Sequence, residues 1–152
     1  MKVAIVYLSY GGNTKDLSFK ILNLLVGCGL DAHIFTNKDN PNLNEFDYVL
    51  LGSLTWDEGK LPIQMRKYMR KILIDEPINV QYFSVFGTGE TQWGMNNYCK
   101  AVEEISYHLQ KHGKTVHHQL KIEQNPIGKD KFIISYVNDI LKEVELIESK
   151  SS

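Results

Sequence analysis

The chain has 152 residues, of which 43% are hydrophobic and 23% are charged, and its formal net charge is -1 at pH 7. This length suits one domain, and the composition is that of a soluble globular protein rather than a disordered or membrane-spanning one. Because 17 basic residues nearly balance 18 acidic ones, the overall charge favours neither nucleic acid nor an anionic membrane as a partner. With no signal-peptide pattern and only two cysteines, we expect a cytoplasmic protein with reduced thiols.

Short apolar runs rich in β-branched and aromatic residues predict strands, and apolar residues at helical spacing lie between them. In chain order the pattern gives a strand at 3–8, a helix at 17–25, a weaker strand at 32–36, a strand at 48–53, a helix at 63–72, a strand at 82–86, a helix at 98–109, a strand at 115–122 and a helix at 133–144. This alternation favours a parallel sheet covered on both faces. We therefore expect one α/β domain over 1–148, a doubly wound three-layer sandwich with a five-stranded parallel sheet of order 2-1-3-4-5, and a frayed tail at 149–152.

Two side features of the sequence concern charge and histidine. Five basic residues crowd one segment, which is either a solvated helix face or a docking patch: Lys60, Arg66, Lys67, Arg70 and Lys71. His117 and His118 are adjacent in the last predicted strand, and neighbours in a regular strand point to opposite faces. We therefore predict that they do not share a metal ion, that the protein has no metal site, and that its histidines lie at the surface.

The first informative loop follows the first predicted strand and leads into a helix. In an open α/β sheet the ligand crevice lies outside the carboxyl ends of the strands. Glycines let backbone N–H groups approach an anion, hydroxyls add donors, and a helix N-terminus adds a favourable dipole. The loop lacks the motifs of nucleoside triphosphate and dinucleotide sites, so we expect it to bind a terminal phosphate monoester. Its residues are Ser9, Tyr10, Gly11, Gly12, Asn13 and Thr14.

Two further loops are expected at the same edge, and each contains one of the chain's two tryptophans. A tryptophan in a polar loop needs a contact that covers its ring, and a planar ligand can provide it. A phosphate group on one side and two large aromatic rings on the other describe a flat heteroaromatic phosphomonoester. The second loop supplies Ser53, Leu54, Thr55, Trp56, Asp57, Glu58 and Gly59, and the third supplies Gly87, Thr88, Gly89, Glu90, Trp93, Gly94, Tyr98 and Cys99.

These three loops resemble those of the flavodoxin family, and the resemblance covers nearly the whole chain. Residues 5–14 with Ile21 are similar to the family's FMN phosphate signature, although Ser18 stands where the family usually has Ala. Thr55-Trp56 and residues 86–90 resemble the second and third flavin loops. The resemblance implies a short-chain flavodoxin that holds FMN by its phosphate in the first loop and by its ring between Trp56 and Trp93.

The sequence also departs from the family it resembles. Asp57 stands where the family usually has Gly, Trp93 stands where it most often has Tyr, and the chain is nearly neutral where typical members are strongly acidic. The family resemblance implies a monomeric electron carrier, not an enzyme, that works between a flavodoxin reductase and an acceptor oxidoreductase. An alternative stays open, because residues 89–94 also resemble flavodoxin-like activators of manganese class Ib ribonucleotide reductase, whose partner is the reductase's small subunit.

Overall fold

The helices and strands alternate along the chain in the computed structural model, which describes residues 1–56, 59–91, 94 and 97–151. Short 3-10 turns, η1 (Asn37–Asp39) and η2 (Leu43–Glu45), connect β2 to β3, and a π-helical segment, η4 (Lys71–Asp75), extends the second helix. The main elements are β1 (Lys2–Leu8), α1 (Asn13–Gly27), β2 (Asp31–Thr36), β3 (Tyr48–Leu54), α2 (Ile63–Arg70), β4 (Tyr82–Gly89), α3 (Lys100–Lys111), β5 (Thr115–Glu123) and α4 (Asp130–Ser151).

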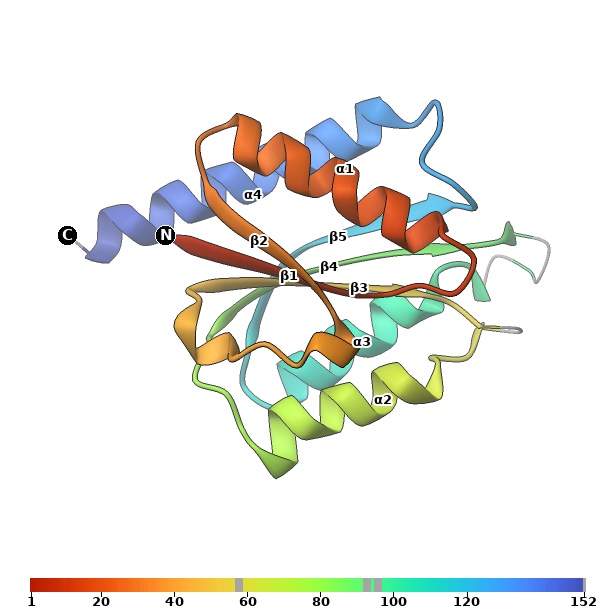
Figure 1. The fold of residues 1–152 in the computed structure, drawn as a ribbon, viewed down its shortest axis with the longest axis horizontal. Helices are drawn as coiled ribbons and strands as arrows, with labels where there is room; N and C mark the ends of the chain where they lie inside the picture. The colour runs from red at the N-terminus through yellow and green to blue at the C-terminus, as the bar shows by residue number, and fades with distance from the viewer. Residues whose placement is uncertain (57–58, 92–93, 95–96, 152) are drawn as a thin grey trace.

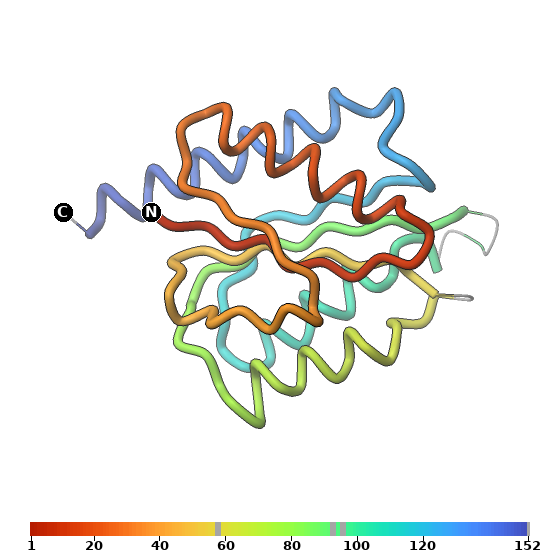
Figure 2. Tube along the Cα trace, viewed as in Figure 1, coloured from red at the N-terminus to blue at the C-terminus, as the bar shows by residue number. Residues whose placement is uncertain are grey.

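The strands form one five-stranded sheet in the order β2-β1-β3-β4-β5, and every neighbouring pair is parallel. Helices α1 and α4 cover one face of this sheet, and α2 and α3 cover the other (Figure 1). The predicted doubly wound three-layer sandwich of order 2-1-3-4-5 is therefore confirmed. The carboxyl ends of β1, β3 and β4 lie on the same side of the molecule (Figure 2), as the rule for ligand crevices requires.

The sheet separates two hydrophobic cores. Alternate residues of β1 point to opposite faces, so Ala4 and Val6 pack under α2 and α3, whereas Val3 and Ile5 pack under α1 and α4. All four side chains are fully buried. Because helices cover both faces, the central strands need apolar residues at nearly every position, which explains why they appear in the sequence as continuous apolar runs.

Strand β4 is longer than the sequence predicted, because it continues beyond Phe86 through Gly89. Two of its glycines lie where the backbone is crowded. A Cβ on Gly87 would lie 2.6 Å from the carbonyl oxygen of Ser53, and one on Gly89 would lie 2.8 Å from the backbone nitrogen of Cys99. Glycine therefore serves here to let β3, β4 and the start of α3 approach closely, rather than to end the strand.

The expectation about the two adjacent histidines is wrong in its geometry. The register between β4 and β5 shifts between Phe83 and Val85, so the strand is not regular at this point. As a result both imidazoles approach the same carboxylate, with His117 Nε2 3.7 Å and His118 Nε2 3.4 Å from Glu143. A bulge breaks the alternation of side chains that the prediction assumed. Within the described ranges, no cluster of three or more His, Cys, Asp or Glu residues could hold a metal ion.

His117 also differs from the surface residue that the sequence suggested. Its side chain is only 15% exposed, and its ring stacks with the rings of Tyr48 and Tyr82, at centroid distances of 5.7 and 5.6 Å. The predicted tail is helical as far as it is described, because α4 continues to Ser151, where the hydroxyl donates a hydrogen bond to the Ile147 carbonyl. No helix among the described residues is long and apolar enough to span a membrane.

Candidate functional site

A polar cavity of about 330 Å³ lies at the carboxyl edge of the sheet. It is formed where the segments that follow β1, β3, β4 and β5 meet, so residues far apart in sequence share it. Its size is at the lower end of the range of small-molecule sites. The residues that line it are Ser9, Tyr10, Gly11, Asn13, Thr14, Leu54, Thr55, Thr88, Gly89, Glu90, Asn97 and Gln124.

One wall of this cavity is the N-terminal end of α1. Gly12 precedes the helix with φ of 92°, a left-handed conformation that glycine adopts without a steric cost, and its N–H donates to Ser9 Oγ at 3.2 Å. No side chain caps the helix, and a Cβ added to Gly11 or Gly12 would meet nothing within 4 Å. The first backbone N–H groups of α1 therefore lie beside open space at the positive end of the helix dipole, an arrangement that suits an anion.

Hydrogen bonds between side chains and backbone join the three loops behind the cavity. The hydroxyls of Thr14 and Thr88 lie 2.7 Å apart and are buried, which ties the start of α1 to the end of β4. Thr55 donates its N–H to the Thr88 carbonyl at 3.0 Å, and its hydroxyl accepts from Ala101 N–H at 3.2 Å. Because each loop is tied to another, the cavity wall is held in place by the scaffold and not by one flexible segment.

An aromatic pair extends the site at its outer rim. Tyr10 and Trp56 meet edge to face, with ring centroids 5.1 Å apart, and are 47% and 45% exposed. The Tyr10 hydroxyl donates to Gln64 Oε1, which fixes this ring against the start of α2. Tyr10 lines the polar cavity and also a second hollow of about 780 Å³ beside Trp56, so the two hollows adjoin. Large, half-exposed aromatic surface therefore lies next to the anion cradle, where a planar ring can pack on it.

The sequence-predicted residues divide into three groups. Ten of them line the polar cavity, and Trp56 lines the adjoining hollow, while Gly12 supports the first loop. Asp57, Glu58 and Trp93 lie outside the described residues, so the predicted pairing of Trp56 with a second tryptophan has no structural description. The remaining residues lie behind or beside the cavity without lining it: Ser53, Gly59, Gly87, Gly94, Tyr98 and Cys99.

Cys99 has a structural place rather than a place in the cavity. Its side chain is fully buried, and its thiol lies 3.6 Å from the Ile122 carbonyl and 3.8 Å from the Gly87 carbonyl. Burial raises the pKa of this thiol to about 11, so it stays protonated at neutral pH and is a poor nucleophile. Cys99 therefore packs the junction between β4, β5 and α3.

Two residues that line the cavity, Asn97 and Gln124, were not predicted from the sequence. Gln124 follows β5 directly, its φ is 56°, and its N–H donates to the Gly89 carbonyl at 2.8 Å. The rule that ligands bind at carboxyl ends of strands could have identified it. Asn97 packs against Gly59, whose Cβ position would lie 2.8 Å from the Asn97 side chain. No local pattern signals that contact, because it joins two loops 38 residues apart in the numbering.

The fold and the cavity together define a class of protein. A helix N-terminus that is open to an anion, a polar wall of hydroxyls and amides, and an adjacent aromatic rim suit a phosphorylated planar ligand. Among the described lining residues there is no cysteine, histidine or lysine, and the polar groups of the wall are hydroxyls, amides, the Glu90 carboxylate and backbone groups. The class is a doubly wound α/β protein with a candidate site for a flat phosphate ester at the carboxyl edge of its sheet.

Comparisons with known proteins identify the family. Residues 5–131 match the sequence pattern of the family described as Flavodoxin. The chain is 32% identical over 128 residues to probable flavodoxin 1 of Bacillus subtilis (strain 168), an alignment that covers 82% of this chain and 79% of that protein. This chain belongs to the flavodoxin family, whose members are non-enzymatic electron carriers with FMN as cofactor.

Solved structures agree with this assignment. A flavodoxin from the domain Archaea is 28% identical, with a TM-score of 0.80 and coverage of 95% of this chain and 99% of that one. A short-chain flavodoxin associated with a PDU bacterial microcompartment has a TM-score of 0.83 at 17% identity, covering 94% of this chain and 99% of that one. At that identity the second likeness shows the fold alone.

Proposed function

We propose that this protein is a diffusible single-electron carrier that binds one FMN without a covalent link and passes electrons from a reductase to acceptor oxidoreductases. We further propose that it works as a monomer in the cytoplasm. The observation that carries the proposal is the open helix N-terminus beside the Tyr10–Trp56 pair at one edge of the sheet. The unpaired thiols of Cys28, which is exposed, and Cys99 support a reducing compartment.

The residues of the polar cavity fit the phosphate end of FMN. We assign the phosphate to the first loop, where Ser9, Asn13 and the N–H groups at the start of α1 surround open space. The buried Thr14–Thr88 pair holds this loop in register with β4, because a shift of either element would break that hydrogen bond in a dry environment. This arrangement binds a dianion without a cationic side chain in the described wall.

The ring end of FMN is assigned to the side of the cavity at Tyr10, where the cavity adjoins the hollow that Trp56 lines. Thr88, Gly89 and Glu90 also line that cavity, and we assign their backbone groups to the polar edge of the flavin. FMN, when bound, takes up and releases single electrons, and the chain's task is to hold it at an accessible edge. The predicted contributions of Asp57, Glu58 and Trp93 to this end remain proposals.

A charge change in the first loop tests the phosphate assignment. In Asn13→Asp a carboxylate faces the phosphate, and one unit charge about 5 Å away at an effective dielectric near 20 costs roughly 3 kcal/mol before screening. We expect FMN affinity to fall about 30-fold or more, measured by quenching of FMN fluorescence on titration with apoprotein. An acidic residue in the first turn of a helix favours the fold, so apoprotein stability should not fall.

The matched control is Asn23→Asp, which makes the same chemical change at an exposed position of the same helix. Its FMN affinity should equal that of the unmodified protein. Equal affinities for the two variants would refute the phosphate assignment, and failure of the unmodified protein to bind FMN would refute the proposed function.

The same FMN-loaded preparation distinguishes the carrier from the activator. The likeness of residues 89–94 to the activator group is the observation that keeps this second function in view. A carrier transfers electrons to protein acceptors without oxygen. An activator requires oxygen and restores activity to the small subunit of a manganese class Ib ribonucleotide reductase. Radical formation in that subunit only when this protein is present would favour the activator function.

A further inference from the structure

Residues 60–71, which come after the acidic pair Asp57 and Glu58, form a strongly basic segment. Residues 60–71 contain five lysines and arginines and no acidic residue, although the chain as a whole is almost neutral. Helical periodicity places the apolar and the charged side chains of this segment on different faces. Met65, Tyr68 and Met69 are buried against the sheet, whereas the charged side chains point outward. We call the exposed set the α2 face, and its members are Lys60, Arg66, Lys67 and Arg70.

The acidic neighbours that the structure describes neutralise this face only weakly. Arg66 lies 3.8 Å from Glu104, and Arg70 lies 3.5 Å from Asp75, with the arginine side chains 57% and 71% exposed. Pairs that are this long and this open to water contribute little. Lys60 and Lys67 form no ion pair with any residue in the described part of the chain. The α2 face therefore keeps a positive field at the protein surface.

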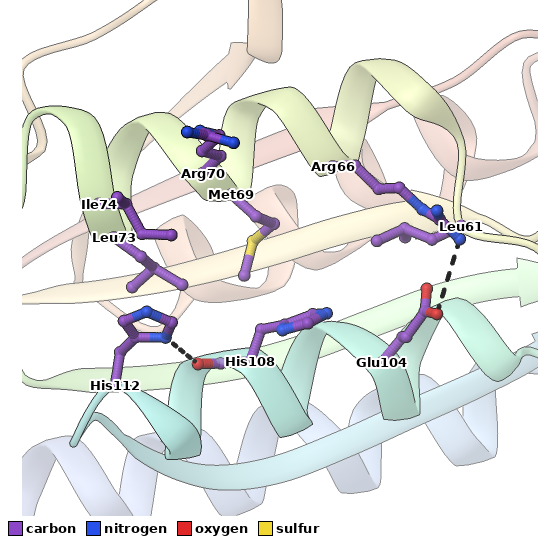
Figure 3. A pocket seen from close by; sticks show the side chains of 9 residues that line it. All are labelled: Leu61, Arg66, Met69, Arg70, Leu73, Ile74, Glu104, His108 and His112. Atoms are coloured by element: carbon purple, nitrogen blue, oxygen red, sulfur yellow. Dashed lines mark hydrogen bonds and ion pairs between the residues drawn. The ribbon is translucent and has the colours of Figure 1, made fainter.

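An apolar groove of about 360 Å³ runs beside the α2 face, between α2 with its extension η4 and helix α3. In Figure 3, Met69 and Leu73 point from the α2 side toward α3, and His108 and His112 project toward them from the other side. Leu61 lines this groove and also the hollow that contains Trp56. The groove therefore lies beside the outer rim of the candidate FMN site.

We propose that the α2 face and this groove form a docking surface for the acidic face of a partner redox protein. This inference rests on the proposed electron-carrier function and specifies the kind of partner. Carboxylates of the partner would pair with Lys67 and Arg70, and its apolar side chains would enter the groove beside Met69 and Leu73. Because the groove and the hollow beside Trp56 share Leu61, a partner held in this way lies next to Trp56, where the exposed edge of the flavin is assigned.

Several features favour an acidic protein over a nucleic acid. Three of the basic residues, Arg66, Lys67 and Arg70, lie on α2, which is short: its 8 residues span about 12 Å at 1.5 Å per residue. They lie beside exposed apolar surface, since Ile63 is 67% and Trp56 45% exposed. A compact patch of apolar groups with charges at its border is typical of a protein interface, whereas a nucleic-acid surface is dominated by phosphate contacts over a longer track.

The test uses one acceptor in two charge states. Reduced FMN-loaded protein is mixed in a stopped-flow instrument with native cytochrome c, which is basic, or with cytochrome c whose lysines have been succinylated, which is acidic. In each reaction one electron leaves the flavin and reduces one ferric haem. We expect the acidic form to react at least about 10-fold faster at low ionic strength, and this preference to shrink as salt screens the charges.

Charge reversal locates the effect. The double variant Lys67→Glu/Arg70→Glu should slow reduction of the acidic cytochrome by about 10-fold and remove most of its salt dependence. The control Lys131→Glu/Lys142→Glu makes the same change in net charge on α4, the layer that covers the opposite face of the sheet (Figure 1), and should change the rate less than about 2-fold.

FMN content and midpoint potential are measured for every variant, so that loss of the cofactor is distinguished from loss of docking. If the loaded protein reduces both cytochromes but prefers the basic form, or if the two double variants behave alike, the docking surface is refuted while the carrier function stands. Co-sedimentation with phosphatidylserine vesicles, together with equal rates for the two cytochromes, would assign the α2 face to a membrane and overturn the inference. A protein that takes up no FMN would refute the carrier function itself.

Discussion

Two hydroxyl pairs in this molecule look alike but belong to regions with different tasks. At the carboxyl edge, Thr14 and Thr88 lie 2.7 Å apart, and next to the bulge in β5, Tyr48 and Ser84 lie 2.6 Å apart. Each pair is buried and joins elements far apart in sequence. The threonine pair borders an open polar cavity, whereas Tyr48 and Ser84 are fully buried and the Tyr48 hydroxyl lies 3.1 Å from His117 Nδ1.

The difference shows that polar groups in a sheet can be distinguished by whether other protein groups satisfy their hydrogen bonds. At the bulge, protein groups complete the network, because the Tyr48 hydroxyl contacts both Ser84 and His117, and Glu143 lies beyond. At the edge, backbone N–H groups and glycine positions face open space and require a ligand or water. We therefore assign the bulge to stability and the edge to binding, and the following changes test that division.

The largest expected effect comes from closing the space between β3 and β4 at the edge. In Gly87→Val, the Cβ would lie 2.6 Å from the Ser53 carbonyl oxygen and 2.7 Å from Val102 Cγ2, contacts that the backbone has to move to relieve. We expect the free energy of unfolding to fall by at least about 3 kcal/mol, measured by urea denaturation of the apoprotein. Gly27→Ala, at a helical position with open space around it, is the control and should be neutral or slightly stabilising.

The second test compares the two hydroxyl pairs directly. Tyr48→Phe removes the hydroxyl that Ser84 and His117 share, so we expect the free energy of unfolding to fall by about 1–3 kcal/mol while FMN affinity is unchanged. Thr88→Val removes the corresponding group at the edge and should lower FMN affinity about 5- to 10-fold. Both variants need a denaturant titration and a fluorescence titration with FMN. The division between the regions fails if Tyr48→Phe is the variant that loses FMN.

The third test concerns the aromatic rim. Trp56→Ala removes a half-exposed ring beside the polar cavity and should weaken FMN binding by about 1–2 kcal/mol, or about 5- to 30-fold. Phe132→Ala removes an exposed ring on α4 and should leave FMN affinity unchanged. Equal affinities for the two variants in the fluorescence titration would remove Trp56 from the site.

The smallest expected effect is a pH dependence of the free energy of unfolding, caused by His117 at the bulge. Burial lowers the pKa of His117 below 6.5 and His118 adds to the decrease, while Glu143 opposes it. The folded protein therefore binds this proton less readily than the unfolded chain does. Stability that is fully present above pH 6.5 should decline as the pH falls below that value and continue to decline until the folded-state pKa is passed.

His117→Phe, which keeps a ring between Tyr48 and Tyr82, should reduce this decline between pH 7 and pH 5. His112→Phe, which removes an exposed histidine near the end of α3, is the control and should retain it. An unchanged slope in both variants would show that other groups set the acid stability of the fold.

Much of the fold could be predicted because it depends on periodicity that the sequence states directly. The buried runs in β1 and β3 must be apolar at nearly every position since helices cover both faces of the sheet, and the helices need one apolar face. The boundaries were less predictable: Gly87 and Gly89 suggested that β4 had ended, yet they continue it. Glycine in a strand and glycine in a loop look alike until the neighbouring backbone is known.

The first loop was the most predictable part of the site, because its cradle is made by consecutive residues and a helix start. Gln124 and Asn97 were missed because they join the cavity only when β5 and the segment before α3 reach the same edge. The bulge was missed for a related reason. A strand's own sequence does not say that Ser84 will face an irregular stretch of β5, so the convergence of His117 and His118 on Glu143 was not expected.

By itself, the sequence determined the order of elements, the layers that cover the sheet and the glycine-containing loop at the start of α1. These features follow from contacts between near neighbours and from the burial that each period of apolar residues requires. Only the tertiary structure decided where the register between β4 and β5 shifts and which side chains complete the cavity. It also decided that Leu61 lines both the groove beside the α2 face and the hollow beside Trp56. Those outcomes depend on the register and packing of distant segments, which are set by the shape of the whole core rather than by any local pattern.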